Sequence, residues 1–168
     1  LPQMEKIVTE RKEETVYRTR GTVVHGFGRG STLLGYPTAN IETKAFVETM
    51  KGAEYGVYFG WARVVVPQKY QGTSTISEEV FKTVLSFGKS VQFGATDDTL
   101  EAYIMHNYDG LFYDYELRVV ICGYIRPMQA FASVQELIQA IDSDVRHAES
   151  SLTDNAALAA LQHDASLM

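Results

Sequence analysis

Cysteine is nearly absent from this chain of 168 residues, and its scarcity excludes two kinds of stabilisation. Cys122 is the one cysteine, so the chain can form neither an internal disulfide framework nor a cysteine-rich zinc site. It follows the apolar residues 119–121, where a buried, unreactive thiol is the ordinary role. His25, His147 and His163 show no spacing with carboxylates or with cysteine that is typical of zinc ligands. We therefore expect no disulfide and no zinc.

The chain also lacks an excess of positive charge and long apolar segments. Fifteen lysines and arginines stand against 21 aspartates and glutamates, a formal net charge of −6. That balance argues against a nucleic-acid binder, including a barrel of the kind that binds single strands. No apolar run approaches membrane-spanning length, and the N-terminus shows no apolar segment typical of a signal peptide. We expect a soluble, cytoplasmic monomer without nucleic-acid or membrane partners; an organellar location stays open.

What the sequence does contain is a succession of β-type segments. They are rich in β-branched and aromatic residues and lie at 16–25, 55–66, 80–88, 100–106 and 111–124. Residues 38–40, if extended, add a sixth. Strand following strand at short spacing favours an antiparallel barrel or sandwich over a parallel α/β sheet. We expect residues 42–54 to form a loop with a brief helical turn, and residues 71–79 to be a mobile insertion.

One helix is predicted near the end of the chain. Ser133 is placed as its N-cap, with Glu136 three residues on as the partner in a capping box. Apolar residues recur at helical spacing and give one face, which we expect to pack on the outside of the sheet: Leu137, Ile138, Ile141, Val145, Ala148 and Leu152.

Three parts make up the predicted chain. Residues 1–15 are a charged N-terminal arm, residues 16–152 are one domain with its helix, and residues 153–168 are a C-terminal extension. In the extension, Asp154 or Asn155 could cap a second short helix, and we expect the last residues to fray.

The most distinctive stretch is residues 21–41. It places glycine at positions 26, 28 and 30 after a β-type segment. Glycine lets backbone N–H groups approach a ligand, and successive N–H groups can form a concavity that binds anions. Thr38 and Asn40, if extended, point to the same side. Two neutral oxygen ligands beside a phosphate loop suit Mg²⁺, which shares its coordination with substrate phosphates and water.

Each of these residues also has an ordinary interpretation. Thr and Asn after Pro37 are commonly turn residues that bond their own backbone. Glu101 is a charged residue in a strand of uncharged neighbours, and such a charge often protects a sheet edge from aggregation. Taken alone, these interpretations would be preferred. Arg29 is equally compatible with a phosphate contact and with a solvated position.

The order of the motifs along the chain favours the functional interpretation of these residues over the ordinary one. Residues 37–40 read Pro-Thr-Ala-Asn after the glycine loop. The later segments are Gly-Val-Tyr-Phe-Gly-Trp-Ala at 56–62, Val-Leu-Ser-Phe-Gly at 84–88, Leu-Glu-Ala-Tyr-Ile-Met-His at 100–106 and Gly-Tyr-Ile-Arg-Pro at 123–127. Together they resemble the riboflavin kinase family over residues 17–152. The resemblance implies a mainly β fold, a six-stranded antiparallel Greek-key β-barrel with a C-terminal α-helix.

The resemblance also implies an activity, in which ATP phosphorylates riboflavin to give FMN and ADP with Mg²⁺ or another divalent ion. It makes Glu101 the general base, with Thr38 and Asn40 as metal ligands. The residues implied to bind nucleotide are Gly26, Phe27, Gly28, Arg29, Gly30, Thr32, Thr38, Ile104, His106 and Tyr113. Those implied to bind flavin are Arg126, Gln129 and Phe131.

The chain departs from the family pattern in one segment. The family usually has an Asn-Pro pair where Ser90 and Val91 stand, so residues 89–92 differ. This difference favours a rival hypothesis, a non-catalytic barrel that stores or delivers FMN. A carrier would need neither a metal pair nor a carboxylate at the reacting end, so Thr38, Asn40 and Glu101 together favour the kinase.

Overall fold

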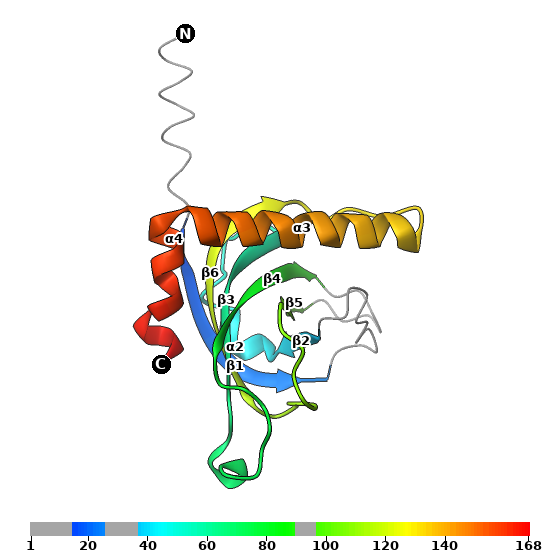
Figure 1. Cartoon of the computed structure of the whole chain (residues 1–168). Helices are drawn as coiled ribbons and strands as arrows, with labels where there is room; N and C mark the ends of the chain where they lie inside the picture. Colours follow the sequence, from blue (N-terminus) through cyan, green and yellow to red (C-terminus); the bar gives the residue numbers. More distant parts are fainter. Residues whose placement is uncertain (1–14, 26–36, 90–96) are drawn as a thin grey trace.

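A computed structural model describes residues 15–25, 37–89 and 97–168 of the chain. Figure 1 shows a barrel with one long helix laid across its outside. The strands are β1 (Tyr17–Val24), β2 (Thr38–Ile41), β3 (Gly56–Val65), β4 (Val80–Lys89), β5 (Asp98–Ile104) and β6 (Glu116–Arg126). They close in the order β1-β2-β5-β4-β3-β6, and every neighbouring pair is antiparallel. The predicted fold class, a six-stranded antiparallel barrel with a C-terminal helix, is confirmed.

Alternation along the strands separates the inside of the barrel from its outside. In β5, Leu100, Ala102 and Ile104 belong to the cluster of buried side chains that fills the barrel. Glu101 and Tyr103 point outward, because successive side chains of a strand lie on opposite faces. Phe46, from the short helix α2 (Thr43–Phe46), joins the interior cluster. The brief helical turn expected within residues 42–54 is therefore present.

The predicted boundaries of β5 and β6 were wrong. β5 spans Asp98–Ile104 instead of residues 100–106, and β6 spans Glu116–Arg126 instead of residues 111–124. Asp114 adopts a left-handed backbone conformation with φ of 71°, which a strand cannot include. The aromatic residues that suggested a strand pack instead: Phe112 is buried in the barrel interior, and Tyr113 stacks on His25. Side-chain packing has overridden β-propensity here.

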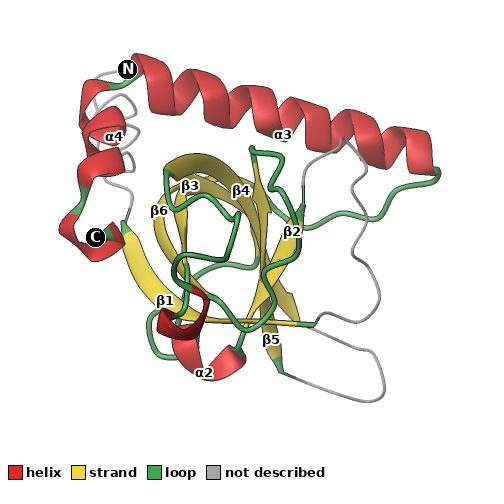
Figure 2. Ribbon diagram, turned by 60° about the horizontal axis from the view of Figure 1, so that its bottom comes forward, coloured by secondary structure: helices red, strands yellow, loops and turns green. Residues whose placement is uncertain are grey.

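The helix α3 (Val134–Asp154) begins as predicted. The Ser133 hydroxyl accepts a hydrogen bond from the Glu136 N–H at 3.1 Å, and the Glu136 carboxylate accepts one from the Ala132 N–H at 3.0 Å. Ala148 and Leu152 are buried against the outer face of the barrel, so the predicted partner of the apolar face is confirmed. Figure 2 shows α3 lying along one side of the barrel. Among the described residues, no helix combines the length and the apolar character that a membrane crossing requires.

The C-terminal extension is docked on the barrel, and the expectation that its last residues fray is wrong. It contains α4 (Ala156–Ala160), η3 (Leu161–His163) and η4 (Ala165–Leu167). Leu167 is fully buried. Its carbonyl accepts from Arg63 at 3.0 Å, and the Met168 carbonyl accepts from Arg118 at 2.6 Å. Outward-facing arginines of β3 and β6 thus hold a segment whose own sequence gave no sign of docking.

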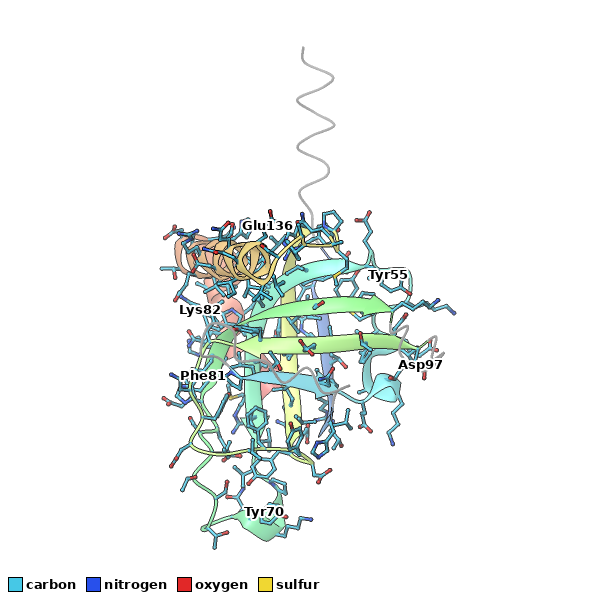
Figure 3. All side chains as sticks on the ribbon, turned by 90° about the vertical axis from the view of Figure 1, so that its right-hand side faces the viewer. Tyr55, Tyr70, Phe81, Lys82, Asp97 and Glu136 are labelled. Carbon is cyan, nitrogen blue, oxygen red and sulfur yellow. The ribbon has the colours of Figure 1, made fainter. Side chains whose placement is uncertain are left out.

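The long connection between β3 and β4 projects from the end of the barrel that lies away from α3. It contains η1 (Gln68–Tyr70), and Figure 3 shows Tyr70 at its tip, far from Glu136 of α3. Hydrogen bonds tie it to the body: the Ser74 and Tyr115 hydroxyls are 2.9 Å apart, and Thr75 donates to the Asp109 carbonyl at 2.7 Å. Its predicted mobility stays a prediction.

Candidate active site

A row of outward side chains crosses five strands of the barrel. Asn40 of β2 is paired with Glu101 of β5, and Glu101 with Ser86 of β4. Ser86 is paired with Val57 of β3, and Val57 with Arg126 of β6. Figure 3 shows β4, β5 and β2 side by side. Paired residues on one face of a sheet are direct neighbours. These five residues, which are spread over positions 40 to 126 of the sequence, therefore lie in one row across the barrel.

A second row lies two residues further along the same face. It runs from Thr38 of β2 to Tyr103 of β5 and Val84 of β4. The structure confirms that residues 38–41 are extended. Thr38 and Asn40 therefore lie on the same side of the strand, as the alternation of a strand requires.

Apart from Asn40, the residues of these two rows form the floor of a cavity of about 350 Å³. Its walls come from the N-terminal half of α3 and from the loop that joins β6 to α3. The lining residues are Thr38, Val57, Val84, Ser86, Glu101, Tyr103, Arg126, Met128, Gln129, Phe131, Leu137, Ile141 and Asp144. A concave site with an apolar lining and a few polar groups is the usual form of a small-molecule site.

Glu101 lies in the middle of the floor and is half-buried. The Asn40 side-chain nitrogen donates to Glu101 Oε2 at 3.4 Å. The strand that carries Glu101 has β2 on one side and β4 on the other, and a closed barrel has no edge to protect. The interpretation of Glu101 as an edge-strand charge is therefore wrong.

Arg126 is held by the carboxylate of Asp144, a residue that no sequence motif singled out. Its Nε donates to Asp144 Oδ1 at 2.9 Å, and its Nη2 donates to Asp144 Oδ2 at 2.8 Å. The same guanidinium lies over the Phe131 ring, 5.6 Å from its centre, and donates to Gln129 Oε1 at 3.3 Å. The three residues predicted to bind flavin are thus brought together at one wall of the cavity.

Some signal for the missed residues was present in the sequence. Asp144 lies on the face of α3 that also carries Ile141 and Ala148, so a charge stood at a position of core spacing. Ser86 lies inside the Val-Leu-Ser-Phe-Gly motif at 84–88, where a serine between apolar residues is compatible with an outward position in a strand. Met128 had no signal, because it lies in the loop between β6 and α3, outside any periodic pattern.

Of the predicted nucleotide residues, Thr38 lines this cavity, and the others lie away from it or outside the described residues. Ile104 is fully buried in the barrel interior. The His106 ring stacks on Phe81 with a centroid distance of 3.9 Å, and Tyr113 stacks on His25 at 3.7 Å. None of Ile104, His106 and Tyr113 lines the cavity around Glu101. The remaining ones, Gly26, Phe27, Gly28, Arg29, Gly30 and Thr32, lie outside the described residues, as do positions 90–92 of the segment that departs from the family pattern.

The donor set at the β2 end of the cavity fits a hard divalent cation. Thr38 and Glu101 line the cavity with a hydroxyl and a carboxylate, and Asn40, hydrogen-bonded to Glu101, adds a neutral amide oxygen beside them. Mg²⁺ prefers oxygen and usually keeps several positions for water and substrate phosphates. Over the described ranges, no group of three or more His, Cys, Asp or Glu side chains could hold a metal ion.

Comparisons with known proteins agree on one family. The model of the family described as Flavokinase: Riboflavin kinase matches residues 13–152. A riboflavin kinase from Homo sapiens is 38% identical over 136 residues, which are 81% of each chain. A bifunctional riboflavin kinase/FMN phosphatase from Arabidopsis thaliana is 40% identical over 132 residues, but this chain spans only 32% of its length. The crystal structure of riboflavin kinase from Trypanosoma brucei superposes with a TM-score of 0.66 at 27% identity, covering 90% of this chain and 86% of that one.

Proposed function

Because this chain belongs to the riboflavin kinase family, and is thus a phosphotransferase, we propose that it transfers the γ-phosphoryl group of ATP to the 5′-hydroxyl of riboflavin. The products are FMN and ADP. The observation that carries this proposal is the position of Glu101, in the floor of a cavity between the oxygens of Thr38 and Asn40 and the loop after Arg126. A carboxylate in that place can accept the proton of a substrate hydroxyl that reaches it from the apolar part of the cavity.

Glu101 acts as the general base. Phosphoryl transfer needs stabilisation of the charge on the transferred group and an acceptor for the proton of the nucleophile. A carboxylate within hydrogen-bonding reach of the hydroxyl supplies the second function. The Asn40 side chain donates to Glu101 Oε2 and so helps to orient the carboxylate within the cavity before the substrate arrives.

Thr38 and Asn40 would hold Mg²⁺ together with the phosphates of ATP. The cation, when bound, neutralises charge on the phosphates. The two side chains come from one short strand that is paired with β1 on one side and β5 on the other. Their spacing is therefore set by the barrel before any substrate binds, which reduces the cost of ordering the site.

The apolar part of the cavity receives the isoalloxazine ring. Val57 and Val84 line its floor, and Phe131, Leu137 and Ile141 line its walls. A flat, largely apolar ring is matched by such a lining, while its ribityl chain can extend along the row toward Glu101. We place the nucleotide outside this cavity, beside His106 and Tyr113 and with Ile104 packed behind.

The test is a product assay with single omissions. The purified protein is incubated with riboflavin, ATP and MgCl₂, and the flavins are separated by chromatography. We expect FMN only when all three are present. Riboflavin bound tightly but never phosphorylated, with several nucleotides and divalent metals, would reject the kinase and favour the FMN carrier.

A further inference from the structure

The pair of Arg126 and Asp144 is the most deeply buried ion pair that the structure describes. The side chain of Asp144 is 5% exposed and that of Arg126 is 19% exposed. Two parallel N–H···O bonds join them, at 2.9 and 2.8 Å. This bidentate geometry is one that arginine can make and lysine cannot. Such a pair requires both partners, because either charge left alone in this place would be uncompensated.

The pair links the two elements that flank the loop of residues 127–132. Arg126 is the last residue of β6, and Asp144 lies three turns into α3. The remaining terminal nitrogen of Arg126 donates to the carbonyl of Pro127 and to Gln129 Oε1, both at 3.3 Å. The guanidinium therefore bonds both to α3 and to the loop between β6 and α3.

The loop has few other anchors on the barrel. Met128 is 51% exposed, and its sulfur accepts a hydrogen bond from the Ser86 hydroxyl at 3.6 Å. Phe131 lies under the guanidinium with a centroid distance of 5.6 Å and is only partly buried. Because little apolar area fixes this segment, the charged pair contributes an unusually large share of its order.

We propose that Asp144 is a positioning residue: by holding Arg126 it keeps loop 127–132 in place as the wall against which the flavin ring binds. This inference rests on the proposed function. Nε, Nη1 and Nη2 of Arg126 all bond to protein atoms. The main work of Arg126 is thus to shape the cavity, with one N–H of Nη2 left for a ligand. A wall that is ordered before binding lowers the entropy cost of capturing the ring.

The first test compares Asp144→Asn with Asp142→Asn. The asparagine keeps the size of the side chain but loses the charge and one of the two acceptor oxygens. Asp142 lies on the same helix, 48% exposed, and pairs with Arg146 at 3.1 Å. We expect Asp144→Asn to weaken riboflavin binding and to raise the riboflavin KM by about tenfold or more, with kcat changed much less. Asp142→Asn should match the wild type.

A second variant separates positioning from folding. Replacing both partners, as Arg126→Met with Asp144→Leu, removes the charges while filling the same space, and such replacements often preserve stability. We expect the double variant to unfold at a temperature close to that of the wild type, yet to bind riboflavin as weakly as Asp144→Asn. Recovery of wild-type riboflavin affinity in this variant would show that the pair serves folding alone and would overturn the proposal.

Riboflavin fluorescence, titrated with the whole chain in the absence of ATP, keeps this inference distinct from the proposed function. If the wild type binds riboflavin and makes FMN while Asp144→Asn binds equally well, only the role of Asp144 is rejected. A wild type that neither binds riboflavin nor makes FMN would reject both.

Discussion

Replacement of Glu101 by glutamine tests the proposed mechanism most directly. The new side chain would keep the length and nearly the volume of the glutamate, and its amide oxygen could still accept the hydrogen bond that Asn40 donates at 3.4 Å. The cavity therefore keeps its shape. What the substitution removes is the negative charge and the basic oxygen that we propose takes the proton of the riboflavin hydroxyl.

The expected size of the effect follows from the role. A positioned general base contributes about 100- to 10,000-fold to the rate. Since each tenfold change in rate corresponds to about 1.4 kcal/mol, the barrier should rise by roughly 3 to 5 kcal/mol. The stability of the fold should change little, because a 3.4 Å hydrogen bond is at the weak end of the range. We thus expect a fall in kcat without a matching loss of riboflavin affinity.

The assay measures FMN formation over time at saturating riboflavin and Mg-ATP, with riboflavin affinity from fluorescence titration. Glu116→Gln is the matched control, because Glu116 is also a carboxylate on a barrel strand but lies outside the cavity, next to Arg118 at 2.9 Å. It should leave kcat unchanged. If Glu101→Gln kept a kcat within about threefold of the wild type, Glu101 could not be the base.

Three further predictions concern the metal, the packing of α3 and the C-terminal extension. Thr38→Val removes one neutral oxygen at almost constant volume, and the Mg²⁺ concentration for half-maximal activity should rise about tenfold in a metal titration. Leu152→Ala should lower the free energy of unfolding in urea by about 2 to 5 kcal/mol, because Leu152 is fully buried, whereas Leu111→Ala, at a position 79% exposed, should change it by less than about 0.5 kcal/mol. Hydrogen bonds from Arg18 hold the pKa of Asp164 well below its usual range. The melting temperature of the wild type should therefore exceed that of Asp164→Asn above about pH 4. This difference should disappear as the pH falls below that value and Asp164 becomes protonated.

Local chemistry was enough to predict most of the elements. The capping box of Ser133 and Glu136 needs only contacts within one turn, so its sequence pattern predicted the start of α3 correctly. The alternation of Thr38 and Asn40 likewise needs only an extended backbone. The start of β6 was predicted wrongly because the aromatic residues before it favour strands by propensity but pack into the barrel and beside His25 instead.

The sequence by itself thus determined the strands, the helix and, through the ordered motifs, the family. Tertiary structure alone decided which side chains meet. The line from Asn40 through Glu101 and Ser86 exists only because β2, β5 and β4 pair in one register, and that register depends on closing the barrel. The partner of Arg126 is Asp144, 18 residues away on a helix. Contacts across such distances depend on the packing of whole elements, which no local pattern of residues encodes.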